Sequence, residues 1–427
     1  MRRDSEPEIP APTTWDITIG KDGGLYLPEE ITRRWDLSPD CELTVKQTPY
    51  GVYLSPLHTP LSKVYVEPTT LCNLKCRTCV RNSWSEPTGS MSMSTFKKLL
   101  DDLEGVPSLG TMAFWGIGEP LVHPDIAEMV GLAHQQGIRT ELITNGHLLN
   151  KDISKRLIEA GLDTLVVSVD GVSSEAYKDI RCGGDLQLIQ ENIDNLHKIR
   201  RELLMNTPEV GIEFVLMQRN LDQLPQLRDT AFSLGAKFIV LTNLLPYTED
   251  MKDEILYGET THYSSNAGRS RFFPEFMLPR LDMLPKYMEP IFKFMQPFGR
   301  AVFGEKEKAE FDDFLCPFIH EGSAAVTWTG DVSPCIALMH SYRCFVLGRE
   351  KSIRRYTIGN VAQENMTQIW NKQEYSDFRK RVKRFEFAPC ISCGGCEFSD
   401  SNEEDCVGNV HPVCGDCLWA RRVILCP

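Results

Sequence analysis

Short apolar runs alternate with amphipathic segments along the middle of the chain, and this pattern predicts strands that are followed by helices. In the segment 94–103, apolar residues recur at helical spacing around two lysines; they are Phe96, Leu99, Leu100 and Leu103. The strand-like runs are Lys63–Glu67, Thr111–Trp115, Arg139–Thr144, Thr164–Val169, Gly211–Met217 and Phe238–Thr242. The helical patterns are Ser94–Leu103, Asp125–Gln136, Lys151–Ala160, Leu186–Leu204 and Leu221–Leu234.

Six apolar, β-branched strands that alternate with helices predict parallel β/α units. Six units rather than eight fit an α/β fold built on an open, partial (β/α)6 TIM-like barrel. In barrels of this architecture, the functional groups lie at the carboxyl ends of the strands. We therefore expect the chemistry of this chain where each apolar run ends.

Four other regions flank the predicted barrel at 61–245. Residues 1–12 are polar and Pro-rich, and we expect a disordered tail. Residues 13–60 have the pattern of a small β-rich unit with the order strand, Gly turn, strand, short helix, strand, hairpin, strand. Residues 246–315 are rich in Pro, Met, Phe and Tyr, which predicts either a bridging helix packed on the barrel or part of a substrate region. Residues 316–427 form a Cys-rich region.

Composition narrows the class of protein. A chain of 427 residues with 42% hydrophobic content is long enough for two or three packed units. A net charge of −13 disfavours nonspecific binding of nucleic acid. The absence of a long apolar run and of a signal-peptide core predicts neither a membrane span nor export. Fifteen cysteines in such a chain indicate metal ligation in a reducing cytoplasm rather than disulfides.

Three cysteines follow the first strand-like run with the spacing C-x3-C-x2-C, at Cys72, Cys76 and Cys79. Three thiolates on one loop can hold three irons of a [4Fe–4S] cube and leave the fourth iron open. An open iron can bind and act on a substrate, whereas a fully ligated cube only passes electrons. The alternatives are a zinc site or buried thiols. Zinc usually takes a fourth ligand, and no further cysteine lies between Val80 and Arg181.

This loop is typical of the radical SAM enzymes, and the chain resembles that superfamily over most of its length. The resemblance implies that the open iron is chelated by the amino and carboxylate groups of S-adenosylmethionine (SAM). It also implies that an electron from the cluster splits SAM into methionine and a 5′-deoxyadenosyl radical. The second predicted strand ends in Trp115-Gly-Ile-Gly-Glu-Pro120. This run is similar to the Gly-Gly-Glu-Pro loop of the family, which grips the SAM amino group, although Ile117 separates the two glycines here.

The resemblance assigns further residues to SAM at the ends of the next strands. Ser168 and Asp170 lie on the same side of a strand, so both could face the barrel interior. Arg181 is similar to the arginine that pairs with the SAM carboxylate, a role that suits its fork of donors. Otherwise, Asp170 marks a simple turn and Arg181 is a surface residue. The full set of expected SAM contacts is Gly116, Gly118, Glu119, Asn145, Ser168, Asp170 and Arg181.

No general base or radical relay can be chosen from the sequence. Glu213, Asn243 and Tyr247 lie near predicted strand ends, but nothing in the pattern distinguishes them.

Ten of the fifteen cysteines fall between Cys316 and Pro427. Cys316 and Cys335 frame the run Cys-x13-Gly-x4-Cys, which resembles the first half of the SPASM extension of radical SAM enzymes. That extension holds two auxiliary [4Fe–4S] clusters. The candidate ligands are Cys316, Cys335, Cys390, Cys393, Cys396, Cys406, Cys414, Cys417 and Cys426, and Cys344 could also enter the count.

The spacing of the later cysteines departs from the family pattern, so no thiol can be assigned to a particular cluster. The alternative is one or two zinc knuckles made from Cys390 and Cys393 with Cys414 and Cys417.

The N-terminal unit at 13–60 resembles the AbrB-like, MazE-type swapped-hairpin barrel, in which two copies intertwine and many members bind DNA. Residues 1–60 hold six Lys and Arg against ten Asp and Glu, which disfavours DNA binding. We therefore expect dimerisation, such as a homodimer through this unit, or partner docking; an inert barrel is the alternative. A redox-sensing DNA-binding regulator is a separate hypothesis, which an electrophoretic shift assay tests.

The segments 67–84 and 396–419 resemble the subgroup of radical SAM maturases that serve tungsten-containing aldehyde oxidoreductases. The resemblance implies modification of the tungsten enzyme or of its pterin cofactor, with reduced ferredoxin or flavodoxin as electron donor. The second hypothesis is an enzyme that modifies a peptide or protein substrate by a thioether bond, a crosslink or side-chain oxidation. A metabolite-directed radical enzyme is a third. An open-iron cube also predicts oxygen sensitivity and anaerobic use.

Overall fold

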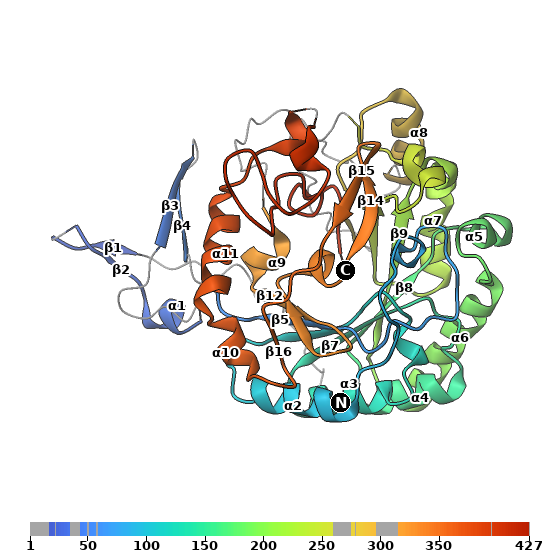
Figure 1. The fold of residues 1–427 in the computed structure, drawn as a ribbon. Helices are drawn as coiled ribbons and strands as arrows, with labels where there is room; N and C mark the ends of the chain where they lie inside the picture. The colour runs from blue at the N-terminus through green and yellow to red at the C-terminus, as the bar shows by residue number, and fades with distance from the viewer. Residues whose placement is uncertain are drawn as a thin grey trace.

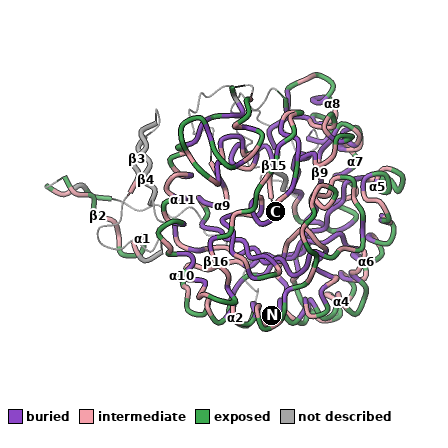
Figure 2. The backbone as a smooth tube through the Cα atoms, in the orientation of Figure 1, coloured by how far each residue is buried: buried purple, intermediate pink, exposed green. Residues whose placement is uncertain are grey.

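The computed structural model describes residues 17–21, 23–34, 43–48, 51–56, 59–258, 275–277, 279–295, 315–393 and 395–426. Its centre is a curved sheet whose strands are ringed by helices on the outside (Figure 1). Figure 2 shows that the strands are buried while the outward faces of the surrounding helices are exposed. No helix among the described residues is long and apolar enough to cross a membrane.

Six parallel strands in sequence order confirm the predicted barrel. They are β5 (Lys63–Val66), β6 (Thr111–Phe114), β7 (Arg139–Thr144), β8 (Thr164–Ser168), β9 (Glu209–Leu216) and β10 (Phe238–Asn243). The predicted helices are α2 (Met93–Leu103), α3 (Ile126–Gln135), α4 (Lys151–Glu159), α6 (Leu186–Glu202) and α7 (Leu224–Ser233). One more helix, α5 (Ser174–Ile180), precedes α6 and was not predicted.

The amphipathic pattern of α2 shows why these segments fold as they do. The side chain of Ser92 caps the helix by accepting a hydrogen bond from the Thr95 amide at 3.1 Å. The predicted apolar face, with Phe96 and Leu99 fully buried, packs into the core between helices and sheet. Lys97 is exposed, and Lys98 reaches Asp102 at 2.8 Å.

The sheet does not stop at six strands. β11 (Glu275–Met277) pairs in parallel with β10, and β12 (Ser323–Val326) pairs in parallel with β5. β13 (Asp331–Ser333) and β16 (Gly359–Asn360) continue from β12, so the described sheet has ten strands. An open parallel sheet leaves unpaired backbone groups at its edges, and the C-terminal region supplies the strands that cover one of them.

The N-terminal unit has the predicted order of elements. Its antiparallel pairs are β1 (Thr18–Ile19) with β2 (Leu25–Tyr26), and β3 (Leu43–Thr48) with β4 (Gly51–Pro56), with α1 (Glu29–Arg34) between them. The unit stands apart from the barrel in Figure 1. The expected tail at 1–12 lies outside the described residues, and the AbrB-like interpretation stays a prediction.

The region at 246–315 is described only in part. α8 (Pro285–Met295) packs against α7 and buries Tyr287, Ile291 and Phe294, as expected of a helix that packs on the barrel. The expected boundaries of this region and of the other units stay predictions.

The C-terminal region combines short strands, helices and cysteine-bearing loops. After α9 (Pro317–Glu321) and β12, the hairpin of β14 (Tyr342–Val346) and β15 (Arg349–Ile353) forms a separate two-stranded sheet. α10 (Met366–Trp370) and α11 (Gln373–Arg384) lie along the side of the barrel (Figure 1). The later cysteines follow α11 in loops with little regular structure.

Candidate functional site

The three-cysteine loop follows β5 directly and is held by the segment that ends α5. The Lys75 amide donates to the Cys182 carbonyl at 3.1 Å, and the Arg77 amide donates to the Ile180 carbonyl at 2.9 Å. Arg77 also donates from Nε to the Asp179 carbonyl at 2.8 Å. A helix that the sequence pattern did not predict therefore positions the predicted cluster loop.

The three thiols of this loop are partly accessible and lie near two arginines. Burial raises the pKa of the Cys76 thiol to about 11, although the guanidinium of Arg181 opposes the shift. Burial also raises the pKa of Cys72, against the opposing charge of Arg81. Metal ligation needs thiolates, so binding of iron would release protons, and the two arginines would offset the resulting negative charge.

Cys182 lies beside the loop through its backbone, yet it does not complete a four-thiol zinc site. Its Sγ is 3.7 Å from the carbonyl oxygen of Asp179. Among the described residues, no three His, Cys, Asp or Glu side chains converge closely enough to hold one metal ion. A zinc ion draws its sulfur ligands to about 2.3 Å, whereas a cube spreads its thiolates over a larger volume.

The loop after β6 packs closely on the cysteine loop because two of its residues are glycines. A Cβ on Gly118 would lie 2.3 Å from the Thr69 carbonyl oxygen, and a Cβ on Gly116 would lie 2.5 Å from Cγ of Glu67. The Glu119 amide donates to the Leu71 carbonyl at 2.8 Å. The predicted glycines thus allow a close approach of backbone to backbone.

Glu119 ties this loop to the end of β7. Its buried carboxylate accepts hydrogen bonds from the Thr144 hydroxyl at 2.6 Å and from the Asn145 amide at 2.7 Å. Asn145 donates from Nδ2 to Oδ1 of Asn73 at 2.9 Å, and the same nitrogen lies 3.9 Å from Sγ of Cys72. Two of the predicted SAM residues therefore meet at the cysteine loop, with Glu119 serving as an internal brace.

Asp170 and Arg181 meet at the end of β8. Nε of Arg181 donates to Oδ2 of Asp170 at 2.8 Å, and the Val215 amide donates to Oδ1 at 3.0 Å. Within the described part of the chain, the two Nη atoms of Arg181 make no hydrogen bond. Arg181 is thus no free surface arginine: its side chain is 11% exposed and lies near Cys76.

Ser168 takes a different partner, because it donates to Oε2 of Glu213 at 3.1 Å across the β8–β9 register. Burial and the charge of Asp170 raise the pKa of Glu213 to about 7. Among the three strand-end residues considered for a general base or a radical relay, Glu213 forms a hydrogen bond with a predicted SAM residue. Asn243 instead donates from Nδ2 to the carbonyls of Arg280 and Val423, at 2.7 and 2.8 Å.

Two residues near this site were missed by the sequence reasoning. Tyr177 of α5 is fully buried, and its hydroxyl has no hydrogen-bond partner among the described residues. Burial raises its pKa, and the charges nearest to it include Arg181, Asp170 and Cys76. His147, whose ring stacks on Tyr177 at 6.0 Å, follows the predicted Asn145. No local sequence pattern indicated a role for Tyr177, because it occupies an ordinary apolar position of a short helix.

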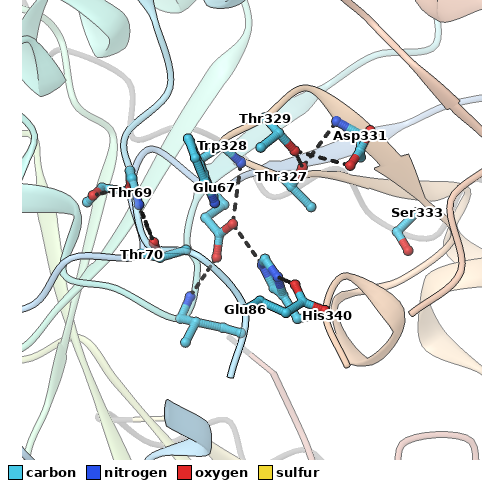
Figure 3. A network of polar contacts seen from close by, with 12 residues as sticks. Glu67, Thr69, Thr70, Glu86, Thr327, Trp328, Thr329, Asp331, Ser333 and His340 are labelled. Atoms are coloured by element: carbon cyan, nitrogen blue, oxygen red, sulfur yellow. Dashed lines mark hydrogen bonds and ion pairs between the residues drawn. The ribbon is translucent and has the colours of Figure 1, made fainter. Parts of the chain in front are cut away.

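A buried ionic network joins the barrel to the C-terminal region (Figure 3). His340 contacts Oε2 of Glu67 through Nε2 at 2.9 Å and Oε2 of Glu86 through Nδ1 at 2.8 Å. The other oxygen of Glu67 accepts from the Ile117 amide at 3.1 Å. The sequence could have pointed to Glu67, because it is a charged residue at the end of the first predicted strand. Its partner His340, however, lies far away in the sequence.

Four C-terminal thiols surround one region of the interior. Cys316, Cys335, Cys414 and Cys417 line a cavity of about 20 Å³, and the last three also line a neighbouring cavity of about 60 Å³ with Cys344. Burial raises the pKa of each of the four, and neighbouring thiols of the same set raise it further for Cys316, Cys335 and Cys414. Cys414 and Cys417 thus share a site with Cys316 and Cys335.

A second set of thiols lies nearer the protein surface. Cys390 is buried, Cys393, Cys396 and Cys406 are exposed, and the thiols of Cys393 and Cys406 contribute to the raised pKa of Cys390.

Cys426 lies close to the first set, because the Cys417 thiol contributes to its raised pKa; its Sγ accepts a hydrogen bond from the indole of Trp419 at 3.2 Å, and its neighbours also include Glu213. Sequence spacing could not make this division, since residues 316 and 414 are far apart along the chain.

Comparison with known proteins identifies the class of enzyme to which the chain belongs. The radical SAM superfamily model matches residues 66–227, and the iron–sulfur cluster-binding SPASM model matches residues 316–397. The chain is therefore a radical SAM enzyme with a SPASM domain, and its cofactors are SAM, a [4Fe–4S] cluster and auxiliary iron–sulfur clusters. Such a site agrees with three features described above. They are the loop of Cys72, Cys76 and Cys79, the Gly116–Gly118 turn after β6, here called the glycine cradle, and the Tyr177 hydroxyl, which has no hydrogen-bond partner among the described residues.

The particular family follows from one relative. The chain is 33% identical over 368 residues to the tungsten-containing aldehyde ferredoxin oxidoreductase cofactor-modifying protein of Pyrococcus furiosus. This match covers 85% of the chain and 96% of the relative, so the chain belongs to the family of that cofactor-modifying protein.

Two solved structures share the fold at low sequence identity. Streptococcus suis SuiB bound to the precursor peptide SuiA has a TM-score of 0.54 at 16% identity, over 79% of this chain and 72% of that one. The enzyme anSMEcpe with bound AdoMet and the Cp18Cys peptide has a TM-score of 0.52 at 17% identity, over 85% and 96%.

Proposed function

We propose that this enzyme uses SAM-derived radical chemistry to mature a tungsten-containing aldehyde oxidoreductase or its pterin cofactor. The observation that carries the proposal is the match to nearly the whole length of a protein named for modifying such a cofactor. When bound, the cluster supplies the electron that splits SAM into methionine and a 5′-deoxyadenosyl radical. Reduced ferredoxin or flavodoxin is the electron donor in this proposal, and a dimer through residues 13–60 is its expected assembly.

The chain's own residues bind and orient SAM in this proposal. Cys72, Cys76 and Cys79 hold the cluster. The Gly116–Gly118 turn presents backbone to the SAM amino group, and Arg181, fixed through Nε by Asp170, points its remaining donors at the carboxylate. Glu119 and Asn145, which are also expected to contact SAM, keep the turn against the cysteine loop.

Glu213 is the group that we expect to take up a proton near the substrate. Its raised pKa, about 7, lets it exchange a proton near neutral pH. It lies beside Ser168 on the neighbouring strand.

The thiols of the SPASM domain divide into two ligand sets. We assign Cys316, Cys335, Cys414 and Cys417 to one auxiliary cluster, because they line the same cavity and thiols of this set contribute to the raised pKa of Cys316, Cys335 and Cys414, whereas no other described thiol contributes to the raised pKa of Cys344. We assign Cys390, Cys393, Cys396 and Cys406 to the second, which leaves Cys344 and Cys426 without a cluster. Two fully ligated auxiliary clusters would carry electrons to or from the barrel.

Anaerobic reconstitution tests these assignments by iron counting. Wild-type protein should hold about twelve irons per chain, from three cubes of four. The variants Cys414→Ala and Cys393→Ala should each lose about four irons, and Cys426→Ser, the matched control, should lose none. Iron loss in the Cys426→Ser protein, or full iron in either of the others, contradicts the assignment.

The maturation proposal has its own experiment. An immature tungsten oxidoreductase is incubated with the reconstituted enzyme, SAM and dithionite, and its activity and the mass of its pterin cofactor are measured. A mass change that needs Cys72, Cys76 and Cys79 supports the proposal. Formation of 5′-deoxyadenosine with no change in the tungsten enzyme or its cofactor overturns it and leaves the radical SAM class intact.

Peptide modification is the second candidate, favoured by the peptides bound to the two structural neighbours. It predicts a mass change in a short peptide encoded beside this gene and none in the tungsten enzyme. The two candidates are separated by the same mass spectrometry, performed on each substrate in turn.

A further inference from the structure

The carboxylate of Glu67 supports the loop that carries the predicted SAM contacts. Glu67 is fully buried at the end of β5, and its Oε1 accepts the hydrogen bond of the Ile117 amide at 3.1 Å. Its aliphatic part fills the space that a Cβ on Gly116 would need. The position of the Gly116–Ile117 turn therefore depends on where Glu67 is held.

His340 of the SPASM domain holds Glu67 in place. Its Nε2 lies 2.9 Å from Oε2 of Glu67, and its Nδ1 lies 2.8 Å from Oε2 of Glu86 (Figure 3). A neutral imidazole has a single N–H and could not donate to both carboxylates. Both ring nitrogens face carboxylate oxygens, and the doubly protonated imidazolium satisfies this arrangement by donating to each of them.

Three parts of the molecule converge on this one ring. Glu86 and Trp84 lie in the segment that leaves the cluster loop, and the Trp84 ring stacks on His340 at 4.8 Å with an interplanar angle of 11°. The SPASM domain adds the Trp328 amide, which donates to Glu67 at 3.3 Å, and the Ser341 amide, which donates to Glu86 at 2.7 Å. His340 itself is 4% exposed, so solvent does not screen the two ion pairs strongly.

We propose that His340 is a positioning residue of the SAM site, through which the auxiliary-cluster domain sets the position of the SAM-binding turn. Glu67 transmits this effect, since it contacts both the imidazolium and the Ile117 amide. The inference rests on the radical SAM class and not on the tungsten substrate. Displacement of the turn weakens SAM binding in ground state and transition state alike, so KM should rise while kcat stays close to wild type.

Two isosteric substitutions test separately the two hydrogen-bonding contacts of the His340 ring. In His340→Gln, the side-chain amide nitrogen takes the place of Nε2 and keeps the contact with Glu67. In His340→Asn, the amide nitrogen takes the place of Nδ1 and keeps only the contact with Glu86. His197→Gln is the matched control, because this half-buried histidine of α6 bonds the Leu234 carbonyl at 2.9 Å, away from the turn.

The holoenzyme is reconstituted anaerobically, and iron is counted first, so that loss of a cluster is not mistaken for loss of SAM binding. SAM is then titrated into dithionite-reduced protein, with the EPR spectrum of the cluster as the binding readout. KM for SAM and kcat for 5′-deoxyadenosine formation are measured without any tungsten enzyme. Failure of maturation therefore leaves this test unaffected.

The His340→Asn protein should show a Kd and a KM for SAM raised about tenfold or more, the size expected for loss of one hydrogen bond to a charged group. His340→Gln should stay within about threefold of wild type, and His197→Gln should match wild type. Equal behaviour of the Asn and Gln proteins, or a fall in kcat at unchanged KM, overturns the proposal.

A second variant keeps the test decisive if His340→Asn fails to take up iron. Glu67→Asp keeps the charge but shortens the side chain, so that it cannot reach Ile117 and His340 together. It should raise KM for SAM by the same factor, and a wild-type KM in a fully iron-loaded Glu67→Asp protein contradicts the role given to Glu67.

Discussion

Arg181 donates a hydrogen bond from Nε to Oδ2 of Asp170 across 2.8 Å, and the carboxylate of Asp170 is fully buried. The pair joins the end of β8 to the segment that follows α5, next to the cysteine loop. A guanidinium held through Nε keeps its two terminal amino groups oriented as a fork. We therefore expect Asp170 to act on SAM through Arg181.

The first prediction concerns this pair. Asp170→Asn removes the charge that orients Arg181, and we expect the SAM concentration for half-maximal EPR change to rise about tenfold. Arg181→Lys should produce at least the same loss, since an ammonium cannot bind a carboxylate in a bidentate manner while bonded to Asp170. Asp229→Asn, in a mostly exposed pair with Arg228, is the control. Wild-type SAM binding by Asp170→Asn would refute this role.

The second prediction uses the glycine cradle. Gly118→Ala places a methyl group 2.3 Å from the Thr69 carbonyl oxygen, so the turn and the cysteine loop must separate. We expect loss of SAM cleavage with most iron retained. Gly131→Ala, inside α3, is the comparison, because the atom nearest to its added Cβ would be Cβ of Ala160 at 3.6 Å, an ordinary contact distance. A helical Gly→Ala change should stabilise the protein by about 0.5–1 kcal/mol, and equal activity of the two variants would argue against the cradle.

The third prediction is the pH dependence of stability that His340 causes. Burial alone would lower its pKa, but the hydrogen bonds with Glu67 and Glu86 outweigh burial and raise the pKa from 6.5 to about 9. A group whose pKa is raised on folding contributes stability that is complete below the unfolded value and is lost as pH rises through the folded value. The contribution, on the order of 3 kcal/mol, should therefore be present below about pH 6.5 and fade towards pH 9.

Urea unfolding of wild type and His340→Gln from pH 6 to about pH 10 measures this contribution. The difference between the two proteins should shrink as the pH rises. A constant difference across this range would show that the imidazolium is not what stabilises the network.

The fourth prediction concerns a buried ion pair between the two sets of auxiliary thiols. Lys351 of β15 donates to both carboxylate oxygens of Asp416, at 2.9 and 2.8 Å, and both side chains are nearly inaccessible. Lys351→Met leaves Asp416 with the more distant Arg349 at 3.7 Å, and a broken buried pair costs about 3–5 kcal/mol.

The midpoint of urea unfolding should therefore fall sharply for Lys351→Met. Lys155→Met, which removes an exposed pair with Glu159 on α4, should leave the midpoint near wild type. The Lys351→Met protein should also show more negative auxiliary cluster potentials, since a nearby positive charge favours the reduced state. Wild-type stability would mean that Asp416 finds compensation elsewhere.

Much of the barrel follows from local pattern. The six apolar runs and the five helical periodicities all formed the expected elements, because burial of one face depends on residue spacing within a single segment. The cysteine loop was predicted from the spacing of its three thiols, and the Gly116–Gly118 turn from its resemblance to the Gly-Gly-Glu-Pro loop of the family; both are contiguous runs that follow predicted strands. Parallel topology then placed these strand ends together at one edge of the sheet.

Contacts between distant segments could not be predicted in this way. Helix α5 holds the cysteine loop through backbone hydrogen bonds, which no side-chain pattern encodes. The grouping of Cys414 and Cys417 with Cys316 and Cys335 depends on how loops fold over the barrel.

The sequence by itself determined which atoms can do chemistry in this protein: three thiols for an open cluster, a set of later thiols, and polar groups at strand ends. Only the tertiary structure decided which of these groups meet, as in the imidazolium of His340 between Glu67 and Glu86. The physical reason is range. Hydrophobic periodicity and turn-forming residues act over a few positions of the sequence. A buried ion pair forms between whichever charges the packed elements bring together, so no local sequence pattern predicts its two partners.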